Sequence, residues 1–162
     1  MNESSGPAEL EGYLRSQSAV LDELNAFLDT VVEEDLQRHD GRNRKSGFVV
    51  AGIIENYYTC VETQLFRIVQ EFGNRVDPER WHADLLNRLA VDVPGIRPRV
   101  LSDGSHRLLD ELRRFRHFKR YYFGIEYDWD KLDFLIRKQR ELHSMLRREV
   151  VEFVAFLRKL ES

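Results

Sequence analysis

The chain has 162 residues, a formal net charge of −3 and one cysteine, Cys60, which cannot form an internal disulfide. A net negative charge excludes a protein that coats nucleic acid with its whole surface. No apolar run approaches the roughly 20 residues that cross a bilayer, and the N-terminal segment lacks the basic and apolar regions of a secretory signal. We therefore expect one soluble cytoplasmic domain over residues 1–162, disordered at residues 1–7, with no membrane contact.

Apolar residues recur at three- and four-residue steps over residues 10–32, which predicts a first long helix. Two glycines and a run of polar residues at 38–47 interrupt this pattern. A second and more apolar helix is predicted over residues 48–72, with a glycine at position 73 that suits the C′ position after a helix. A proline at position 78 favours the start of a short helix that runs to about residue 90.

Residues 91–105 contain two prolines and two glycines and are predicted to form a loop. A fourth helix is predicted over residues 106–122, and a last helix that reaches residue 160 has Asp128 or Asp130 as its N-cap. No internal repeat and no strand-like alternation is present. Short connections between helices favour an all-α fold, an antiparallel bundle of four main helices and one short helix.

The segment 112–124, LRRFRHFKRYYFG, combines five cationic side chains, one histidine and five aromatic residues. On a helix, one face is apolar, and Lys119 falls within it, where it either turns its charge to water or marks the place at which the helix loses its regularity. The apolar face is formed by Leu108, Leu112, Phe115 and Tyr122. A second, outward face is cationic and consists of Arg113, Arg116, His117 and Arg120. No acidic residue lies between positions 111 and 126, so this face predicts an anionic ligand or partner. The alternative is an ordinary solvated face.

At this point the sequence resembles a known family. A helical bundle with an Arg–polar–x–x–x–His–x–Tyr motif late in the chain is typical of HEPN-domain ribonucleases. The stretch 110–132, DELRRFRHFKRYYFGIEYDWDKL, resembles their HepT-like branch, the toxins of toxin–antitoxin pairs. The resemblance implies a homodimer whose motif residues meet at the dimer interface, metal-independent cleavage of RNA, and a minimal nucleotidyltransferase as the cognate antitoxin.

Two registers of the motif are possible. In the first, Arg116 is the motif arginine and His117 the polar residue, while Tyr121 stands at the motif histidine and Phe123 at the motif tyrosine. In the second, His117 is the motif histidine and Arg113 its arginine, with a spacer of three residues.

RNA cleavage without metal needs a base for the ribose 2′-hydroxyl and cations for the phosphate. We therefore assign catalytic roles to Arg116, His117 and Tyr121, with His117 as the base. RNA binding is assigned to Arg113, Lys119 and Arg120.

Several residues keep two interpretations. The resemblance implies that the antitoxin modifies a tyrosine at the end of the motif, for which Tyr121 and Tyr122 are the candidates. The alternative is that Tyr121 only stacks or packs. On the second predicted helix, one face contains Glu55, Thr59 and Glu62. These side chains are either surface residues, which we favour, or they orient the arginines.

The remaining signals argue against other kinds of site. The histidines at positions 39, 82, 106 and 143 lack the spacing of a zinc site, so we predict no metal and no cofactor. We expect Trp81 in the core with His82 at its edge, and Cys60 as a small core residue. We predict a HepT-like toxin that cleaves RNA or has become an attenuated RNA-binding derivative. The alternative is a non-enzymatic helical module whose basic face binds an acidic protein.

Overall fold

The computed structural model describes residues 6–73 and 81–162. Within these ranges the chain forms five α-helices and one π-helical turn. They are α1 (Pro7–Thr30), η1 (Val31–Asp35), α2 (Arg44–Glu71), α3 (Trp81–Leu89), α4 (Asp103–Tyr121) and α5 (Trp129–Glu161). No β-strand occurs in the described ranges, apart from an isolated bridge between Val93 and Arg97. The predicted all-α bundle of four main helices and one short helix is confirmed.

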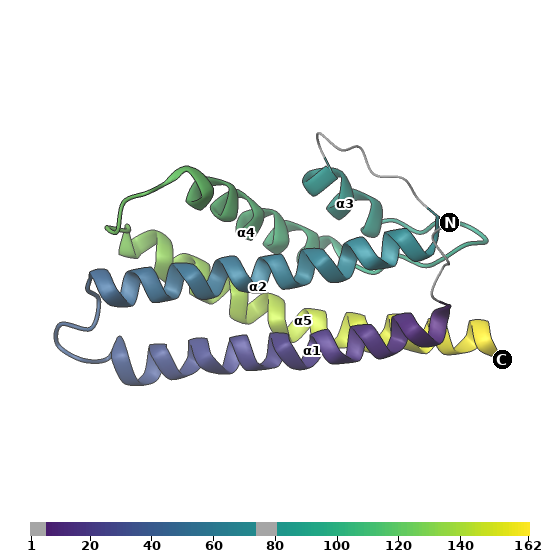
Figure 1. Cartoon of the computed structure of the whole chain (residues 1–162), viewed down its shortest axis with the longest axis horizontal. Coiled ribbons are helices and arrows are strands. Elements are labelled where there is room, and N and C mark those ends of the chain that lie inside the picture. The colour runs from purple at the N-terminus through teal and green to yellow at the C-terminus, as the bar shows by residue number, and fades with distance from the viewer. Residues whose placement is uncertain (1–5, 74–80) are drawn as a thin grey trace.

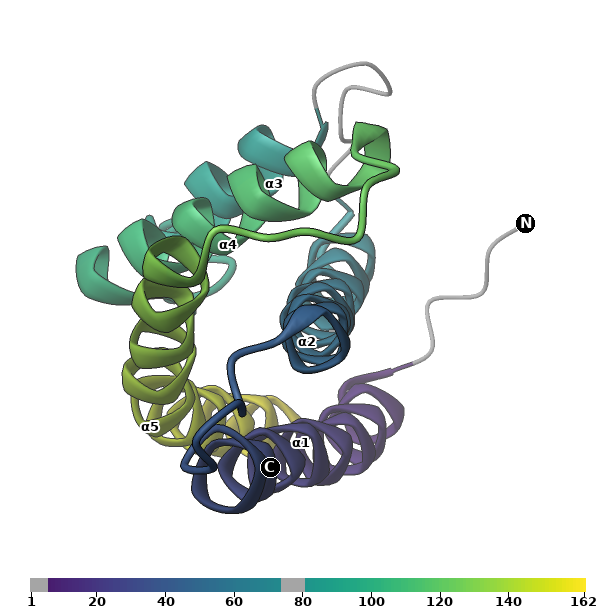
Figure 2. The same ribbon diagram turned by 90° about the vertical axis from the view of Figure 1, so that its left-hand side faces the viewer.

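Helix α2 lies at the centre of the bundle. Figure 1 shows α1 and α2 side by side and antiparallel, with α5 behind them and with α3 and α4 along the opposite side of α2. In the end-on view, α2 lies inside an arc formed by α1, α5, α4 and α3 (Figure 2), and it contacts each of them. Its buried side chains include Val50, Ile54, Tyr57 and Leu65. A residue of α2 can therefore meet side chains from any other helix.

Local sequence signals account for the helix ends. Asn43 and Ser102 are the N-caps of α2 and α4, and their side chains accept hydrogen bonds from the backbone N–H groups of Ser46 and Ser105. Asp128, one of the two predicted caps, has this role at the start of α5. Gly73 follows α2 with a left-handed φ of 72°, as predicted for a C′ glycine.

The predicted boundaries differ at three helix starts, one of which is that of α1. Helix α2 begins at Arg44 and α4 at Asp103, a few residues earlier than the apolar pattern indicates, because their polar first turns follow good caps. The predicted helix start at Pro78 and the predicted disorder of residues 1–5 lie outside the described residues. Pro7, included in that predicted disorder, is the first residue of α1. None of the described helices is long and apolar enough to cross a membrane.

A chain of three polar side chains, of which those of Tyr57 and His143 are buried, ties the three longest helices together. His143 of α5 contacts Asp22 of α1 through Nε2 at 2.9 Å and Tyr57 of α2 through Nδ1 at 2.9 Å. Burial lowers the pKa of His143 and raises the pKa of Tyr57, so both side chains are neutral at pH 7. A neutral imidazole donates one hydrogen bond, to Asp22, and accepts one, from the Tyr57 hydroxyl. This network fixes the register of α1, α2 and α5.

Candidate functional site

The centre of the candidate site is an ion pair between α2 and α4. Glu62 of α2 is only 3% exposed. Its Oε1 accepts a hydrogen bond from Nη1 of Arg116 at 2.9 Å, and the Arg116 guanidinium also lies 5.7 Å from the ring centre of Tyr58. A carboxylate buried to this extent is stable only when it is paired and hydrogen-bonded. The pair therefore holds Arg116 in one position against α2.

The second oxygen of Glu62 is shared by two further donors. The hydroxyl of Tyr58 donates to Oε2 at 2.8 Å, and Nδ1 of His82 lies 2.7 Å from the same oxygen. Burial and the Glu62 carboxylate raise the pKa of Tyr58, so its hydroxyl stays protonated and donates. Three helices, α2, α3 and α4, thus meet on one carboxylate. We call Tyr58, Glu62, His82 and Arg116 the Glu62 cluster.

Aromatic contacts fix the imidazole of His82. Its ring centre lies 3.8 Å from that of Trp81, and Trp81 packs in turn on Phe66 of α2 at 5.4 Å. The His82 side chain is 32% exposed, whereas Glu62 below it is almost fully covered. Trp81 is partly buried against the core, as the sequence predicts. His82 lies at the core edge, but its ion pair with Glu62 is a feature that sequence analysis missed.

Much of the positive charge of α4 is paired with carboxylates of the same chain. Lys119 pairs with Glu55 of α2 at 2.9 Å, and Arg113 pairs with Asp110 at 2.8 Å. The prediction of an outward face was therefore wrong for Arg116, whose side chain is 16% exposed and turned towards α2. The sequence predicts an anionic ligand or partner for this face, and carboxylates of the same chain supply part of that negative charge.

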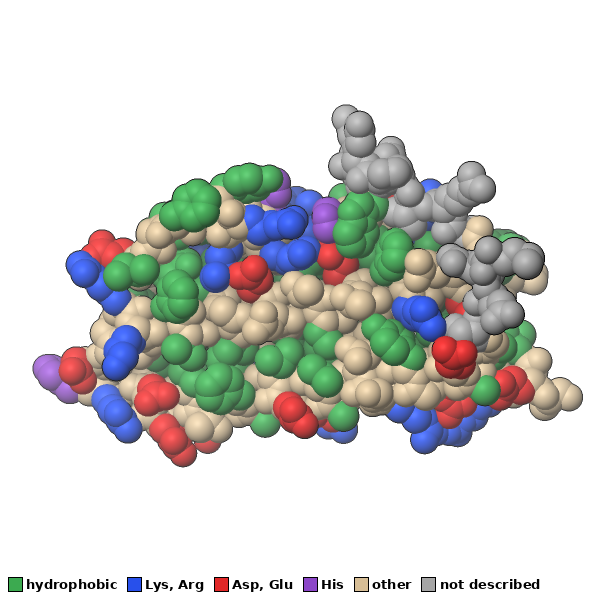
Figure 3. All heavy atoms as spheres, in the orientation of Figure 1, with side chains coloured by type: hydrophobic (Ala, Val, Ile, Leu, Met, Phe, Trp, Pro, Cys, Tyr) green, Lys and Arg blue, Asp and Glu red, His purple; other side chains and the backbone are tan. Residues whose placement is uncertain are grey.

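Three of the predicted site residues remain open to solvent at the end of α4. His117, Arg120 and Tyr121 are exposed, and the ring of His117 makes an edge contact with Tyr121 at 5.3 Å. Figure 3 shows Lys and Arg side chains gathered where α4 lies over α2, with carboxylates beneath them and histidine side chains beside them. The cationic face of α4 is thus divided. Arg116 is anchored to Glu62, and an exposed edge is formed by His117, Arg120 and Tyr121.

The two candidate tyrosines differ in their surroundings. Tyr121 is 72% exposed. Tyr122 is half-buried, stacks on Phe118 at 5.0 Å, and donates its hydroxyl to the carbonyl oxygen of Glu126. Phe123, which stands at the motif tyrosine, is 92% exposed. Tyr121 is thus the more accessible of the two tyrosines, with an edge contact to His117.

The favoured interpretation of Glu55, Thr59 and Glu62 as surface residues was wrong for Glu62. Glu62 is buried beneath Arg116, and Glu55 is partly covered by Lys119. Thr59 donates its hydroxyl to the backbone carbonyl of Glu55 and takes no part in the ion pairs. Cys60 is half-buried beside the core, where burial raises the pKa of its thiol. Its role as a packing residue agrees with this position.

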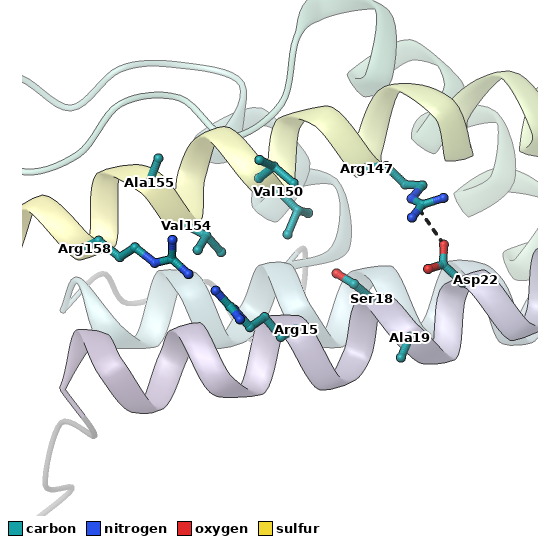
Figure 4. Close-up of a pocket in the computed structure, with 10 residues that line it drawn as sticks. Arg15, Ser18, Ala19, Asp22, Arg147, Val150, Val154, Ala155 and Arg158 are labelled. Atoms are coloured by element: carbon teal, nitrogen blue, oxygen red, sulfur yellow. Dashed lines mark ion pairs between the residues drawn. The ribbon is translucent and has the colours of Figure 1, made fainter.

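A separate hollow of about 450 Å³ lies between α1 and α5 (Figure 4). Its lining combines valine and alanine side chains with three arginines. Each arginine has a carboxylate partner, because Arg15 and Arg158 contact Glu11 and Arg147 contacts Asp22. No group of three His, Cys, Asp or Glu side chains in the described part of the chain is arranged to hold a metal ion.

Comparison with known proteins decides the family. A family model described as HepT-like protein matches residues 49–157, which is more than half of the chain. The chain belongs to the HepT-like family. The match runs from α2 to α5 and includes the whole Glu62 cluster and the exposed edge of α4. No curated protein and no solved structure gives a match to the chain.

The site of this HepT-like protein thus combines predicted and unpredicted residues. Arg116 is joined by Tyr58, Glu62 and His82, whereas His117 and Tyr121 contact each other on the exposed side of α4. No contact between Arg116 and Tyr121 occurs within the described chain. The acidic residues on one face of α2 and the basic residues of α4 could have indicated the ion pair of Glu62. Nothing in the local sequence of α3 indicates the role of His82.

The buried pair predicts a large difference between two arginines of α4. Arg116→Ala leaves the Glu62 carboxylate buried without its cation and is expected to lower the free energy of unfolding by about 3 kcal/mol. Arg120→Ala removes an exposed charge and is expected to change it by less than about 0.5 kcal/mol. Urea unfolding at pH 7 measures both. Adding Glu62→Gln to Arg116→Ala should cost less than the sum of the single changes, and additivity would contradict the pairing.

Proposed function

We propose that this HepT-like protein acts on RNA as the toxin of a toxin–antitoxin pair and cleaves it without a metal ion. The observation that carries the proposal is the position of Arg116, which the buried Glu62 holds beside exposed acid–base and cationic groups of the same helix. A guanidinium has five N–H donors, of which one goes to Glu62, and the others suit a phosphate. A cation fixed in advance stabilises the charge that develops on phosphorus during cleavage.

The exposed edge of α4 supplies the remaining parts. His117 is an acid–base group in contact with the Tyr121 ring. Arg120 adds a positive charge for the RNA backbone, and the exposed ring of Tyr121 suits stacking on an unpaired base. Arg113 and Lys119, each already paired with a carboxylate, contribute less to binding than their charges suggest.

We propose that the protein acts as a homodimer. Large apolar side chains are exposed together at the end of α4 and just after it: Phe118, Tyr121, Phe123 and Ile125. Clustered exposed apolar groups are typical of protein interfaces. A two-fold axis at this place brings Tyr121 of one protomer towards the site of the other, which a single chain does not do.

Cleavage and binding are expected to separate in two variants. His117→Ala should lower the cleavage rate of single-stranded RNA in EDTA at least about 100-fold, with RNA affinity unchanged. Arg120→Ala should weaken binding and reduce the slope of log K against log salt by about 1. Arg137→Ala removes an exposed cation of α5 and is the control. Full cleavage by the His117 variant removes His117 from the mechanism. A folded protein that does not bind RNA at low salt favours the alternative, a module that binds an acidic protein.

The dimer has its own test. Light scattering at micromolar concentration should give about twice the 19.2 kDa of one chain. Phe123→Asp places a charge in the proposed interface and should shift the protein to monomers. Val151→Asp changes a comparably exposed apolar residue of α5, distant from that interface, and should leave the dimer intact. A monomeric unmodified protein would overturn the dimer proposal.

We also propose Tyr121 as the acceptor if a partner nucleotidyltransferase modifies this protein. Its hydroxyl is exposed, whereas that of Tyr122 is engaged with the Glu126 carbonyl. A nucleotide on Tyr121 places negative charge beside Arg120 and blocks the RNA-binding edge. Co-expression with the partner should add a nucleotide mass that is lost in Tyr121→Phe and kept in Tyr122→Phe. An unmodified mass with an active partner contradicts the proposal.

A further inference from the structure

We infer that His82, on α3, is the general base of the proposed RNA cleavage and that Glu62 is its positioning residue. This inference rests on the proposed function and moves the role of base from His117, to which the sequence analysis assigns it, to a residue outside the α4 motif. Tyrosine is a poor base at neutral pH, and Tyr121 stands where the motif has histidine. His82 comes from another helix and reaches the same carboxylate as Arg116.

The contact with Glu62 defines the protonation of the imidazole. A carboxylate only accepts hydrogen bonds. Nδ1 of His82, at 2.7 Å from Oε2, must therefore carry the ring hydrogen in the neutral form. The lone pair is then on Nε2, the nitrogen that can take a proton. An acidic residue that orients a histidine base in this way also stabilises the imidazolium that forms.

The surroundings hold the imidazole rigidly while leaving it reachable. Glu62 is buried, and its position is fixed by Tyr58 and Arg116 as well as by His82. Trp81 packs against the imidazole at 3.8 Å. About a third of the His82 side chain is exposed, enough for contact with a substrate. An exposed histidine without a function needs neither a buried carboxylate nor this support.

Arg116 and His82 are neighbours across one carboxylate, so a phosphate bound to the guanidinium lies beside the imidazole. Nε2 of His82 removes the proton of the ribose 2′-hydroxyl, and the 2′-oxygen forms a bond to the adjacent phosphorus. The bond between phosphorus and the 5′-oxygen breaks, and that oxygen takes a proton from His117. The products are a 2′,3′-cyclic phosphate and a 5′-hydroxyl end. His117 thereby has the acid role.

The test uses a substitution that keeps the contact and removes the base. In His82→Asn the side-chain amide can still donate to Glu62 from the place of Nδ1, but nothing replaces Nε2. Single-turnover cleavage of single-stranded RNA should fall at least about 100-fold, with RNA affinity and melting temperature unchanged. His39→Asn changes an exposed histidine of the α1–α2 connection and should have no effect.

Two further measurements separate a base from a structural residue. Imidazole added to His82→Ala should restore part of the cleavage, because a small base can occupy the vacated space. The ¹⁵N shifts of the His82 ring should show the hydrogen on Nδ1, whether or not RNA is present. A ring with its hydrogen on Nε2 overturns the assignment.

The outcomes distinguish this inference from the function on which it rests. If the unmodified protein cleaves RNA and His82→Asn cleaves equally fast, His82 is not the base and the proposed function stands. If the folded, unmodified protein cleaves no RNA, the proposed function fails and the role of His82 fails with it.

Discussion

A carboxylate cannot be buried alone, and the arrangement around Glu62 follows from this constraint. Glu62, on the central helix, is almost inaccessible to solvent. Its two oxygens contact one side chain from α4, one from α3 and one from α2 itself. Removing a charge of this kind from water costs several kcal/mol unless its partners are well placed. The short helix α3 and the end of α4 are therefore positioned by electrostatics as well as by apolar packing.

The same constraint changes how a run of basic residues should be interpreted. Residues 112–124 contain five cations and no acid, yet α4 does not present a uniformly positive surface. Glu55 and Glu62 on α2 and Asp110 on α4 take up much of that charge. The positive charge that remains exposed is confined to a narrow edge of α4, beside Arg116, which Glu62 holds in place.

The sequence predicted the helices well because their apolar periodicity, caps and terminating glycine are local signals. It also placed His117 and Arg120 correctly on the exposed side of α4. It failed for Arg116 and Glu62 because a helical wheel shows only one helix and contains no information about which neighbour supplies a countercharge. His82 was missed for the same reason: its partner lies 20 residues away on another element.

The pairing of α1 with α5 has a consequence for how the chain folds. Asp22 contacts His143 and Glu11 contacts Arg158, across 121 and 147 positions of sequence. Loop-closure entropy disfavours such distant contacts until the segments between them are ordered. We therefore expect α2 and its sequence neighbours to associate early and α5 to close against α1 last, an order that pulsed hydrogen exchange can follow. The residues of α2, α3 and α4 that form the candidate site would then come together before α5 packs against α1.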